Sequence, residues 1–272
     1  MTTLTQYRVR LSRHVVLLHG PAGWGEWSPL PGYPSDPERC WRAAEEAATV
    51  AWPAPVREEV RVNALVPALR PDEAAAVAVG HRDVKVKVGD AGDVDRVAAV
   101  RDAIGPHGRL RIDANGAWDV ATAVARIVAM APYDLELVEQ PVASIEDLAA
   151  VRRRVAVPVA ADECVRTVDD ARRLVADVLV VKVQPLGGFA ATLDIIDAAG
   201  LPVVVSSMFE TSVGVAAGLA LAAALDQMPY ACGLGAPERD IVADPLVPVD
   251  GVLKVRRPVP DPALLAAYRA SE

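Results

Sequence analysis

The stretch VKVKVGDAGDVDRVAAVRDAIGPHGRLRID, residues 84–113, contains one complete strand–helix–strand unit. Its two ends, VKVKVG and LRID, have the length and apolar character of buried strands. The middle, DVDRVAAVRDAIG, spaces its apolar residues as an amphipathic helix does. Such units build the parallel sheets of α/β proteins, so this stretch predicts that fold class.

The same alternation continues along the chain from about residue 60. Runs with the composition of strands occupy residues 61–68, 84–89, 110–113, 135–140, 157–163, 178–183, 202–207 and 230–235. Ala-rich helical patterns lie between them, several with Asp, Ser or Thr as N-caps. A doubly wound sheet alternates similarly, but eight runs without a G-x-G-x-x-G motif after the first favour a (β/α)8-type barrel.

The N-terminal part of the sequence predicts a small α+β cap. QYRVRLS and HVVLLHGPAGWGEWSP have the pattern of antiparallel strands, and DPERCWRAAEEAATV that of a helix with Asp36 as N-cap and Pro37 as its first residue. DGVLKVRRP, near the other end, predicts a further strand outside the barrel. We therefore expect a capping domain at 1–58, the barrel at 59–246 and a tail at 247–272 that returns to the cap.

The composition narrows the class of protein. Of 272 residues, 52% are hydrophobic, and the net charge of −8 argues against a nucleic-acid or anionic-membrane surface. Three scattered cysteines suggest neither a disulfide framework nor a zinc site. No signal peptide or membrane-spanning run is recognisable, so we expect a cytoplasmic protein; the oligomeric state stays open, a monomer included.

Charged and polar side chains stand at the C-terminal tips of the predicted strands. In chain order they are Lys85 and Lys87, Asp113, Glu139, Asp162 followed by Glu163, Lys182, and Ser206 with Ser207. In a (β/α)8 barrel these tips converge around one mouth, where the functional groups of the fold lie. We therefore expect these side chains to form one active site.

Three acids on neighbouring strands, Asp113, Glu139 and Asp162, would repel one another unless a cation lay between them. Oxygen ligands without His or Cys nearby favour Mg²⁺. Lys85 and Lys87 leave the same face of one strand, so their repulsion and a nearby metal should lower the pKa of one amine and make it a base. A base beside a metal-bound carboxylate can remove the proton α to that carboxylate.

Five motifs, KVKVG, DANGAW, VEQP, ADE and VKVQPLGG, resemble in order and spacing the muconate-lactonising branch of the enolase superfamily. GPAGWGEWSP, SSMFETSVG and ACGLG are most similar to its o-succinylbenzoate synthase family. The resemblance implies that Lys87 is the acid–base group, that Lys182 opposes it as a cation stabilising an enediolate, and that Lys85 is a helper lysine. It implies that Mg²⁺ is bound by Asp113, Glu139 and Asp162.

The same family implies a small-molecule carboxylate substrate, 2-succinyl-6-hydroxy-2,4-cyclohexadiene-1-carboxylate. Loss of water would give o-succinylbenzoate for menaquinone biosynthesis. Arg111, two residues before Asp113, is a candidate substrate contact, and Ser206 and Ser207 are candidates for the succinyl arm. One departure from the superfamily is the segment RLSRHVVLLHG, which turns from one strand to the next with almost no lid loop.

Three alternatives stay open. An N-acylamino acid racemase or dipeptide epimerase of the same superfamily would use Lys87 and Lys182 as two bases. A metal-free aldolase would form a Schiff base on a barrel lysine, although the three carboxylates argue against it. A binding or scaffold protein without activity would not need the complete set of lysines and acids.

Overall fold

The computed structural model describes residues 4–235 and 239–270. Contacts between residues divide the chain into two units. The first comprises Met1–Val62, Val181–Asp197 and Val204–Glu272, and the second comprises Asn63–Val180 and Ala198–Val203. The domain boundaries expected at 58 and 246 are not those of this division and stay a prediction. In the described part of the chain, no helix combines the length and apolar character needed to cross a membrane.

A seven-stranded sheet contains the first seven runs that the sequence predicts as strands. Its order is β11-β10-β9-β8-β7-β6-β5, and neighbours from β5 to β10 pair in parallel. The bounds are β5 Ala64–Val66, β6 Asp83–Lys87, β7 Arg109–Asp113, β8 Leu135–Glu139, β9 Val159–Ala161, β10 Val178–Val181 and β11 Val203–Val205. The α/β class and the barrel-type sheet are thus confirmed.

Two predicted strands differ from the expectation. Residues 61–68 do not form one strand: the chain first pairs as β4 (Glu59–Arg61) with β12 (Val252–Lys254), and enters the parallel sheet only at β5. The eighth run forms no ladder, since its Cys232 and Gly233 make only isolated parallel bridges, to Val62 and Ser206.

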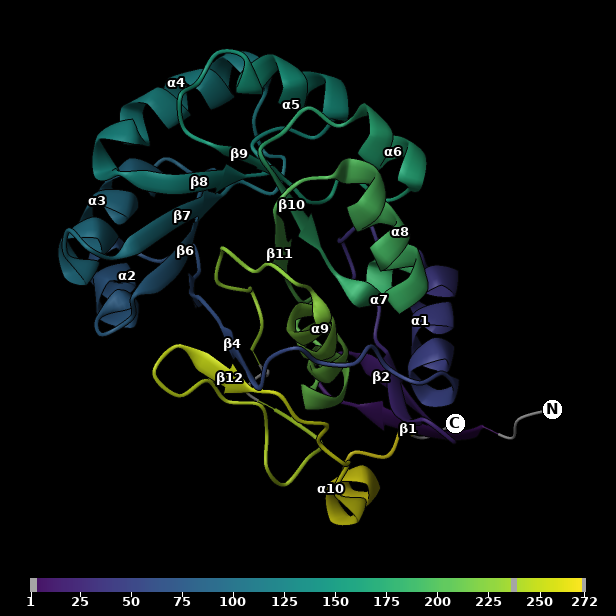
Figure 1. Cartoon of the computed structure of the whole chain (residues 1–272). Coiled ribbons are helices and arrows are strands. Elements are labelled where there is room, and N and C mark those ends of the chain that lie inside the picture. Colours follow the sequence, from purple (N-terminus) through teal and green to yellow (C-terminus); the bar gives the residue numbers. More distant parts are fainter. Residues whose placement is uncertain (1–3, 236–238, 271–272) are drawn as a thin grey trace. The chain divides into compact units, whose positions relative to one another are not determined.

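Helices of the second unit follow their strands as the sequence predicts (Figure 1). They are α2 Pro71–Ala78, α3 Asp93–Ile104, α4 Val120–Met130, the 3-10 turn η1 Ala131–Tyr133, α5 Ile145–Arg152 and α6 Val168–Arg173. The side chains of Asp119, Ser144 and Thr167 accept hydrogen bonds from backbone amides three residues later, so these N-caps fix where α4, α5 and α6 begin.

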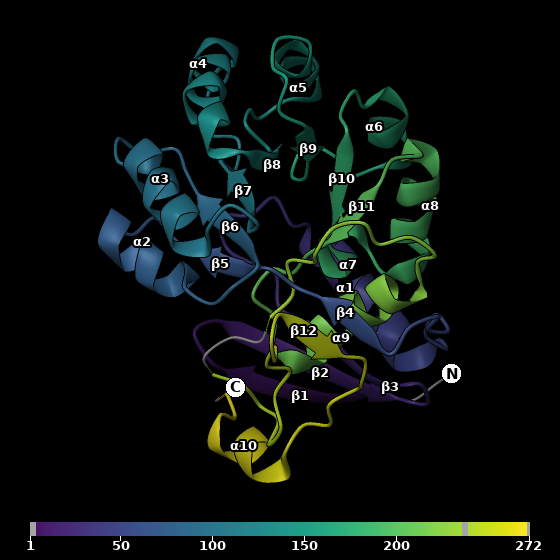
Figure 2. The same cartoon turned by 60° about the vertical axis from the view of Figure 1, so that its left-hand side comes forward.

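In the first unit, β1 (Thr5–Arg10), β2 (His14–Gly20) and β3 (Gly23–Trp27) form the expected antiparallel sheet, seen from a second side in Figure 2. Helix α1 (Pro37–Thr49) starts at the predicted cap, where the Asp36 side chain accepts from the amide of Glu38. Strand β2 is buried on both faces, because Val16 and Leu18 pack on α1 while Val15 and Leu17 pack in a separate cluster.

The other elements of this unit are α7 Val183–Leu186, most of α8 Phe189–Ala199, α9 Ser212–Ala224 and α10 Pro262–Ala267. Gly188 lies between α7 and α8 at φ +114°, and a Cβ there would come within 1.9 Å of Glu46 Oε2. The Glu46 carboxylate accepts hydrogen bonds from the first amides of α8, those of Phe189 and Ala190. The absence of a side chain at Gly188 therefore leaves room for the carboxylate of Glu46. Near the C-terminus, backbone hydrogen bonds tie Tyr268 and Ala270 to β1.

Candidate active site

The strand register of the second unit aligns three of the predicted site residues. Lys87 on β6 pairs with Asp113 on β7, and Asp113 pairs with Glu139 on β8. Each of these residues ends its strand. Ala160 on β9 pairs with Glu139, and Asp162 comes two residues later in the chain. The tips of β6, β7, β8 and β9 thus place the predicted acids and the lysine pair at one end of the sheet.

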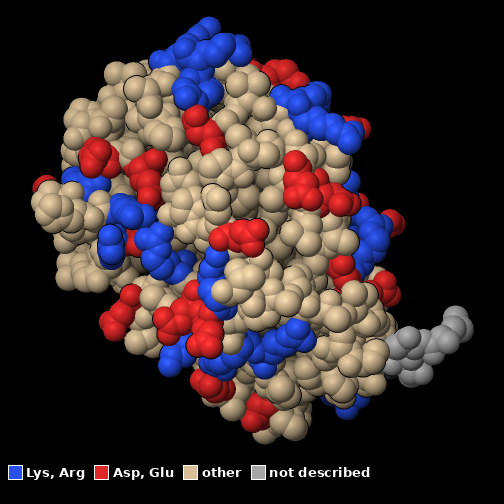
Figure 3. Space-filling model, viewed as in Figure 1, with Lys and Arg blue, Asp and Glu red and all other residues tan. Residues whose placement is uncertain are grey.

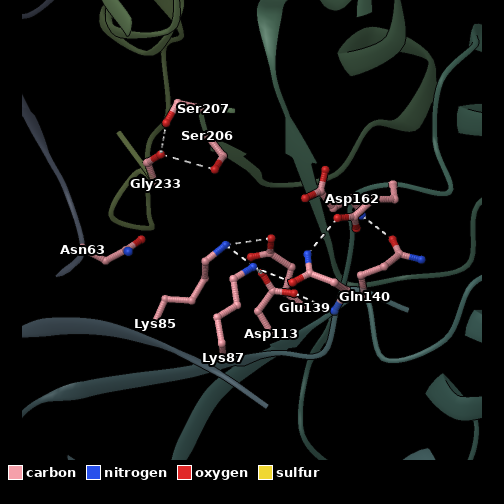
Figure 4. A network of polar contacts seen from close by, with 12 residues as sticks. Asn63, Lys85, Lys87, Asp113, Glu139, Gln140, Asp162, Ser206, Ser207 and Gly233 are labelled. Atoms are coloured by element: carbon pink, nitrogen blue, oxygen red, sulfur yellow. Dashed lines mark hydrogen bonds and ion pairs between the residues drawn. The ribbon is translucent and has the colours of Figure 1, made fainter. Parts of the chain in front are cut away.

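The two lysines of β6 share the carboxylate of Asp113, and Lys85 also contacts that of Glu139 (Figure 4). Lys85 Nζ lies 3.0 Å from Asp113 Oδ2 and 2.9 Å from Glu139 Oε1, and Lys87 Nζ lies 2.7 Å from Asp113 Oδ2. Lys85 is only 8% exposed, and a buried ammonium is tolerated where it is paired and hydrogen-bonded. Burial would raise the pKa of Asp113, but the charges of Lys85 and Lys87 outweigh it and hold that pKa below its usual value.

Asn115 is a site residue that the sequence reasoning missed. Lys87 Nζ donates to Asn115 Oδ1 at 2.6 Å, and Asn115 Nδ2 donates to Glu163 Oε1 at 2.9 Å. The residue sits at φ +46°, in the left-handed region that asparagine tolerates better than most side chains. Its signal is the DANG sequence directly after a strand tip. Asn115 and Asp113 hold the Lys87 amine from two sides.

Gln140 is the second residue that was missed. It is fully buried, and its Oε1 accepts from the backbone amide of Asp162 at 2.7 Å while its Nε2 donates to the carbonyl of Val142 at 2.6 Å. Gln140 therefore joins the end of β8 to the residue that follows β9. Its signal is the glutamine of VEQP, a polar side chain immediately after a buried strand.

The donor chemistry of the three acids suits a hard divalent cation. Asp113, Glu139 and Asp162 are all buried, and Lys85 and Lys87 contact two of them. In the described ranges, however, no three His, Cys, Asp or Glu side chains enclose a metal position. Instead, Lys85 and Lys87 bind the oxygens of Asp113 and Glu139. The structure thus presents an ion-pair network built from the residues that a metal would use.

Arg111 is almost completely buried and has a carboxylate partner inside the second unit. It pairs with Lys85 across β6 and β7, is 1% exposed, and its Nε donates to Glu136 Oε2 at 2.5 Å. Glu136 lies at the irregularity in the pairing of β7 with β8. The structure therefore places Arg111 in an internal ion pair, and its role as a substrate contact stays a prediction.

The remaining candidates belong to the first unit. Lys182 is the N-cap residue of α7, and its Nζ donates to the hydroxyl of Tyr33 at 2.9 Å. The hydroxyls of Ser206 and Ser207 both donate to the carbonyl of Gly233, at 3.3 and 3.1 Å. The opposition of Lys87 and Lys182, and the contacts of both serines with substrate, stay predictions.

Comparison with known proteins agrees with this fold. The model of the family described as Enolase C-terminal domain-like matches residues 70–261, and that described as Enolase N-terminal domain-like matches residues 3–48. A muconate cycloisomerase from Pseudomonas fluorescens has the same fold, with a TM-score of 0.86 at 22% identity over 99% of this chain and 98% of that one. The chain belongs to the enolase superfamily.

Its sequence relatives define a narrower group. It is 54% identical to the o-succinylbenzoate synthase of Thermobifida fusca, over 93% of this chain and 84% of the relative. It is 46% identical to the o-succinylbenzoate synthase of Mycolicibacterium smegmatis, over 96% of this chain and 85% of the relative. The similarity to relatives with this name thus extends over both the cap and the sheet.

Proposed function

We propose that the chain is a lyase that dehydrates 2-succinyl-6-hydroxy-2,4-cyclohexadiene-1-carboxylate to o-succinylbenzoate, as a step of menaquinone biosynthesis in the cytoplasm. The observation that carries the proposal is the lysine pair of β6 bound to Asp113 and Glu139 at the tips of β7 and β8. A lysine pair beside these acids can remove a proton α to a carboxylate. The relatives at 54% and 46% identity are named o-succinylbenzoate synthase.

Asp113, Glu139 and Asp162 are the residues that would hold Mg²⁺. When bound, the ion supplies positive charge for the substrate carboxylate, on which negative charge accumulates as the α proton is lost. The protein's own contribution is to keep the three acids buried and oriented, which Lys85 does for Asp113 and Glu139.

Lys87 is the group that moves the proton. Its amine takes the proton from the ring carbon that bears the carboxylate, and the C–H electron pair passes into the carboxylate as an enediolate. The electrons then return to form the new ring double bond, the C–O bond to the hydroxyl breaks, and Lys87 gives its proton to the departing hydroxide as water. Lys182 stabilises the negative charge as an ammonium throughout.

The amine of Lys87 needs a lone pair and a path to the substrate before this can occur. Its hydrogen bonds to Asp113 Oδ2 and Asn115 Oδ1 must therefore be exchanged for the contact with the α proton. Asn115 is held by Glu163 on its other side, so it can guide the amine without carrying a charge. The same two-lysine set would serve a racemase, which is why the reaction has to be decided by assay.

The test is an assay of purified protein against both substrate classes. Dehydration removes the ultraviolet absorbance of the cyclohexadiene, whereas racemisation exchanges deuterium from solvent into N-succinyl amino acids. We expect rapid loss of absorbance with Mg²⁺ and much slower exchange. Exchange that outpaces dehydration would support the racemase instead, and borohydride trapping of a lysine with activity in EDTA would support the aldolase.

A further inference from the structure

Arg96 is a buried arginine of α3 that contacts the backbone of the proposed base. It is 4% exposed, and its Nη1 donates to the carbonyl of Lys87 at 2.9 Å. Its Nε donates to the carbonyl of Leu69 at 2.6 Å, and its Nη2 donates to both carboxylate oxygens of Asp90, at 3.1 and 2.8 Å. One guanidinium thus joins the segment after β5 to the last residue of β6 and to the loop that follows β6.

The guanidinium of Arg96 lies where the pairing of β6 with β5 ends. Pairing of β6 with β7 reaches Lys87, which lies opposite Asp113, whereas pairing with β5 stops at Val86. Beyond that point, Arg96 bridges the segments that follow β5 and β6 through the carbonyls of Leu69 and Lys87. Because a guanidinium is planar and its donors have a fixed geometry, it holds such acceptors in one arrangement. Arg96 therefore restrains the end of β6 on the side where the ladder no longer does.

Asp93, three residues before Arg96 in α3, fixes the same loop at a second point. Its side chain is fully buried, and its Oδ2 accepts from the backbone amide of Gly89 at 3.1 Å. Its Oδ1 accepts from Nη1 of Arg126 on α4, also at 3.1 Å. Gly89 has a φ of +118°, a conformation that residues with side chains rarely adopt. The turn that follows Lys87 is thus held by two buried charged side chains from the first turn of α3.

The position of the Lys87 backbone matters because its amine stands on a flexible four-carbon stem. The Lys87 side chain is 26% exposed, and its amine contacts Asp113 Oδ2 and Asn115 Oδ1. In turnover it has to exchange these contacts for one with the α proton. A base must lie within hydrogen-bond distance of the proton that it removes, and a displacement of about 1 Å can cost about a hundredfold in rate. A fixed Lys87 carbonyl fixes the point from which the amine moves.

We propose that Arg96 is a positioning residue, which holds the end of β6 so that the amine of Lys87 can reach the α proton. The proposal rests on the proposed function for the role of Lys87 in turnover. Burial of a charge is costly unless the charge is paired, so an apolar side chain would fill this space at lower cost. What the guanidinium adds is a set of directed donors, one of them bound to the backbone of the base. Arg96 acts through that backbone and not on the substrate.

Arg101 provides a matched control on the same helix. Its Nη1 donates to the carbonyl of Gly108 at 2.9 Å, and its Nη2 donates to that of Asp134 at 3.0 Å. These two carbonyls immediately precede β7 and β8, so Arg101 restrains strands where they begin. Arg96→Met and Arg101→Met therefore each remove a guanidinium that binds several carbonyls. Only Arg96→Met removes it from the strand end that carries Lys87.

Nuclear magnetic resonance can report the contact and the side chain separately. The sequence contains only four lysines, Lys85, Lys87, Lys182 and Lys254. Lysine labelled with ¹³C at the carbonyl and ¹⁵N at Nζ therefore gives few signals, each assignable by substitution to arginine. The carbonyl signal of Lys87 reports its contact with Arg96, and the Nζ signal reports the arrangement of its side chain. Steady-state dehydration with Mg²⁺ gives kcat and KM for the same proteins.

In Arg96→Met we expect both Lys87 signals to move, kcat to fall at least about tenfold and KM to change less than about twofold. In Arg101→Met we expect a lower melting temperature, unmoved Lys87 signals and wild-type kcat. Arg96→Lys keeps a cation beside Asp90 but has fewer donors, and it serves as a second variant if Arg96→Met does not fold. The same loss of kcat should accompany a moved Lys87 carbonyl signal there. Circular dichroism shows which variants fold.

An unmoved Lys87 carbonyl signal in folded Arg96→Met overturns the proposal, and so does a moved signal with wild-type kcat. A raised KM with unchanged kcat overturns it as well. If Arg101→Met loses as much kcat as Arg96→Met, the loss follows stability and the proposal is wrong. Failure of both Arg96 variants to fold also overturns it, because the role of Arg96 would then be structural.

Failure of the proposed function would look different. If the wild-type protein does not dehydrate the cyclohexadiene, the proposed function falls. The Nζ signal of Lys87 in Arg96→Met and in Arg101→Met would still decide whether Arg96 positions the lysine, because it needs no turnover. The two failures are therefore distinguishable.

Discussion

Gln140 and Asp162 are joined by a buried hydrogen bond in which the backbone amide of Asp162 donates to Gln140 Oε1 at 2.7 Å. The bond links the tip of β8 to the residue after β9, and thereby two of the three strands that carry the proposed metal ligands. Positioning of Asp162 thus depends on an uncharged side chain that does not itself belong to the ligand set.

Replacement of Gln140 by Leu keeps most of the side-chain volume and removes the hydrogen bonds with the amides of Asp162 and Cys164 and with the carbonyl of Val142. Because the Asp162 amide and the Val142 carbonyl would lose buried partners, we expect the free energy of unfolding to fall by about 2 kcal/mol. Affinity for Mg²⁺ should fall as well. Urea unfolding and titration calorimetry measure the two effects, with the exposed Gln227→Ala as control. Unchanged affinity would show that Gln140 does not position Asp162.

Asp162→Asn tests the ligand set itself. The substitution keeps the size and the backbone hydrogen bond to Gln140 but removes one of three negative charges. We expect affinity for Mg²⁺ to fall by at least about tenfold, because hard cations prefer carboxylate over amide oxygen. Calorimetry on the purified protein gives the affinity directly. A variant that binds Mg²⁺ as tightly as the wild type would remove Asp162 from the ligands.

Glu26 predicts how stability depends on pH. Burial raises the pKa of this carboxyl from 4.5 to about 7, although hydrogen bonds from Ser28 and Thr211 oppose the rise. The folded state therefore binds the proton more tightly than the unfolded state, and stability should fall as the pH rises from about 4.5 through about 7. Ionisation of Glu26 should lower the free energy of unfolding by at most about 3 kcal/mol.

Glu26→Gln cannot ionise, so the pH dependence that Glu26 contributes should disappear. The variant should be less stable than the wild type at pH 5, because an amide cannot accept the backbone hydrogen bonds of Thr211 and Gly214 with both of its ends. Urea unfolding at pH 5 and pH 7.5 measures the slope, and the exposed Glu38→Gln serves as control. The assignment fails if Glu26→Gln retains the wild-type slope.

Three charged residues of the site could be predicted from the sequence because each ends a strand of recognisable length. Lys87, Asp113 and Glu139 are paired neighbours in the register, as parallel strands require. Their roles are not tested by this geometry. The scarcity of lysine also singled out the site, since three of the four lysines of the chain are predicted site residues.

Asn115 and Gln140 could not be found in this way. Each of them follows the last residues of a strand and has a positive φ. Both make their contacts through side-chain amides, and a single amide has neither charge nor periodicity by which a sequence pattern could identify it. Only the folded chain brings Gln140 to the amide of Asp162, or Asn115 to Glu163. Likewise, residues 230–235 have the composition of a strand. In the structure, however, Cys232 and Gly233 form only isolated bridges, with Val62 and Ser206. Acidic and basic side chains are interspersed over the face drawn in Figure 3.

The most direct measurement of the central claim is the dehydration rate of the purified protein with Mg²⁺ and with EDTA, beside the variants Lys87→Ala and Lys254→Ala. Lys254 is an exposed lysine of β12 and provides the matched control. The account predicts turnover that EDTA abolishes and Mg²⁺ restores, a loss of at least about a thousandfold in Lys87→Ala, and wild-type turnover in Lys254→Ala. Turnover that survives EDTA, or a folded Lys87→Ala protein that keeps more than a small fraction of its activity, would contradict it.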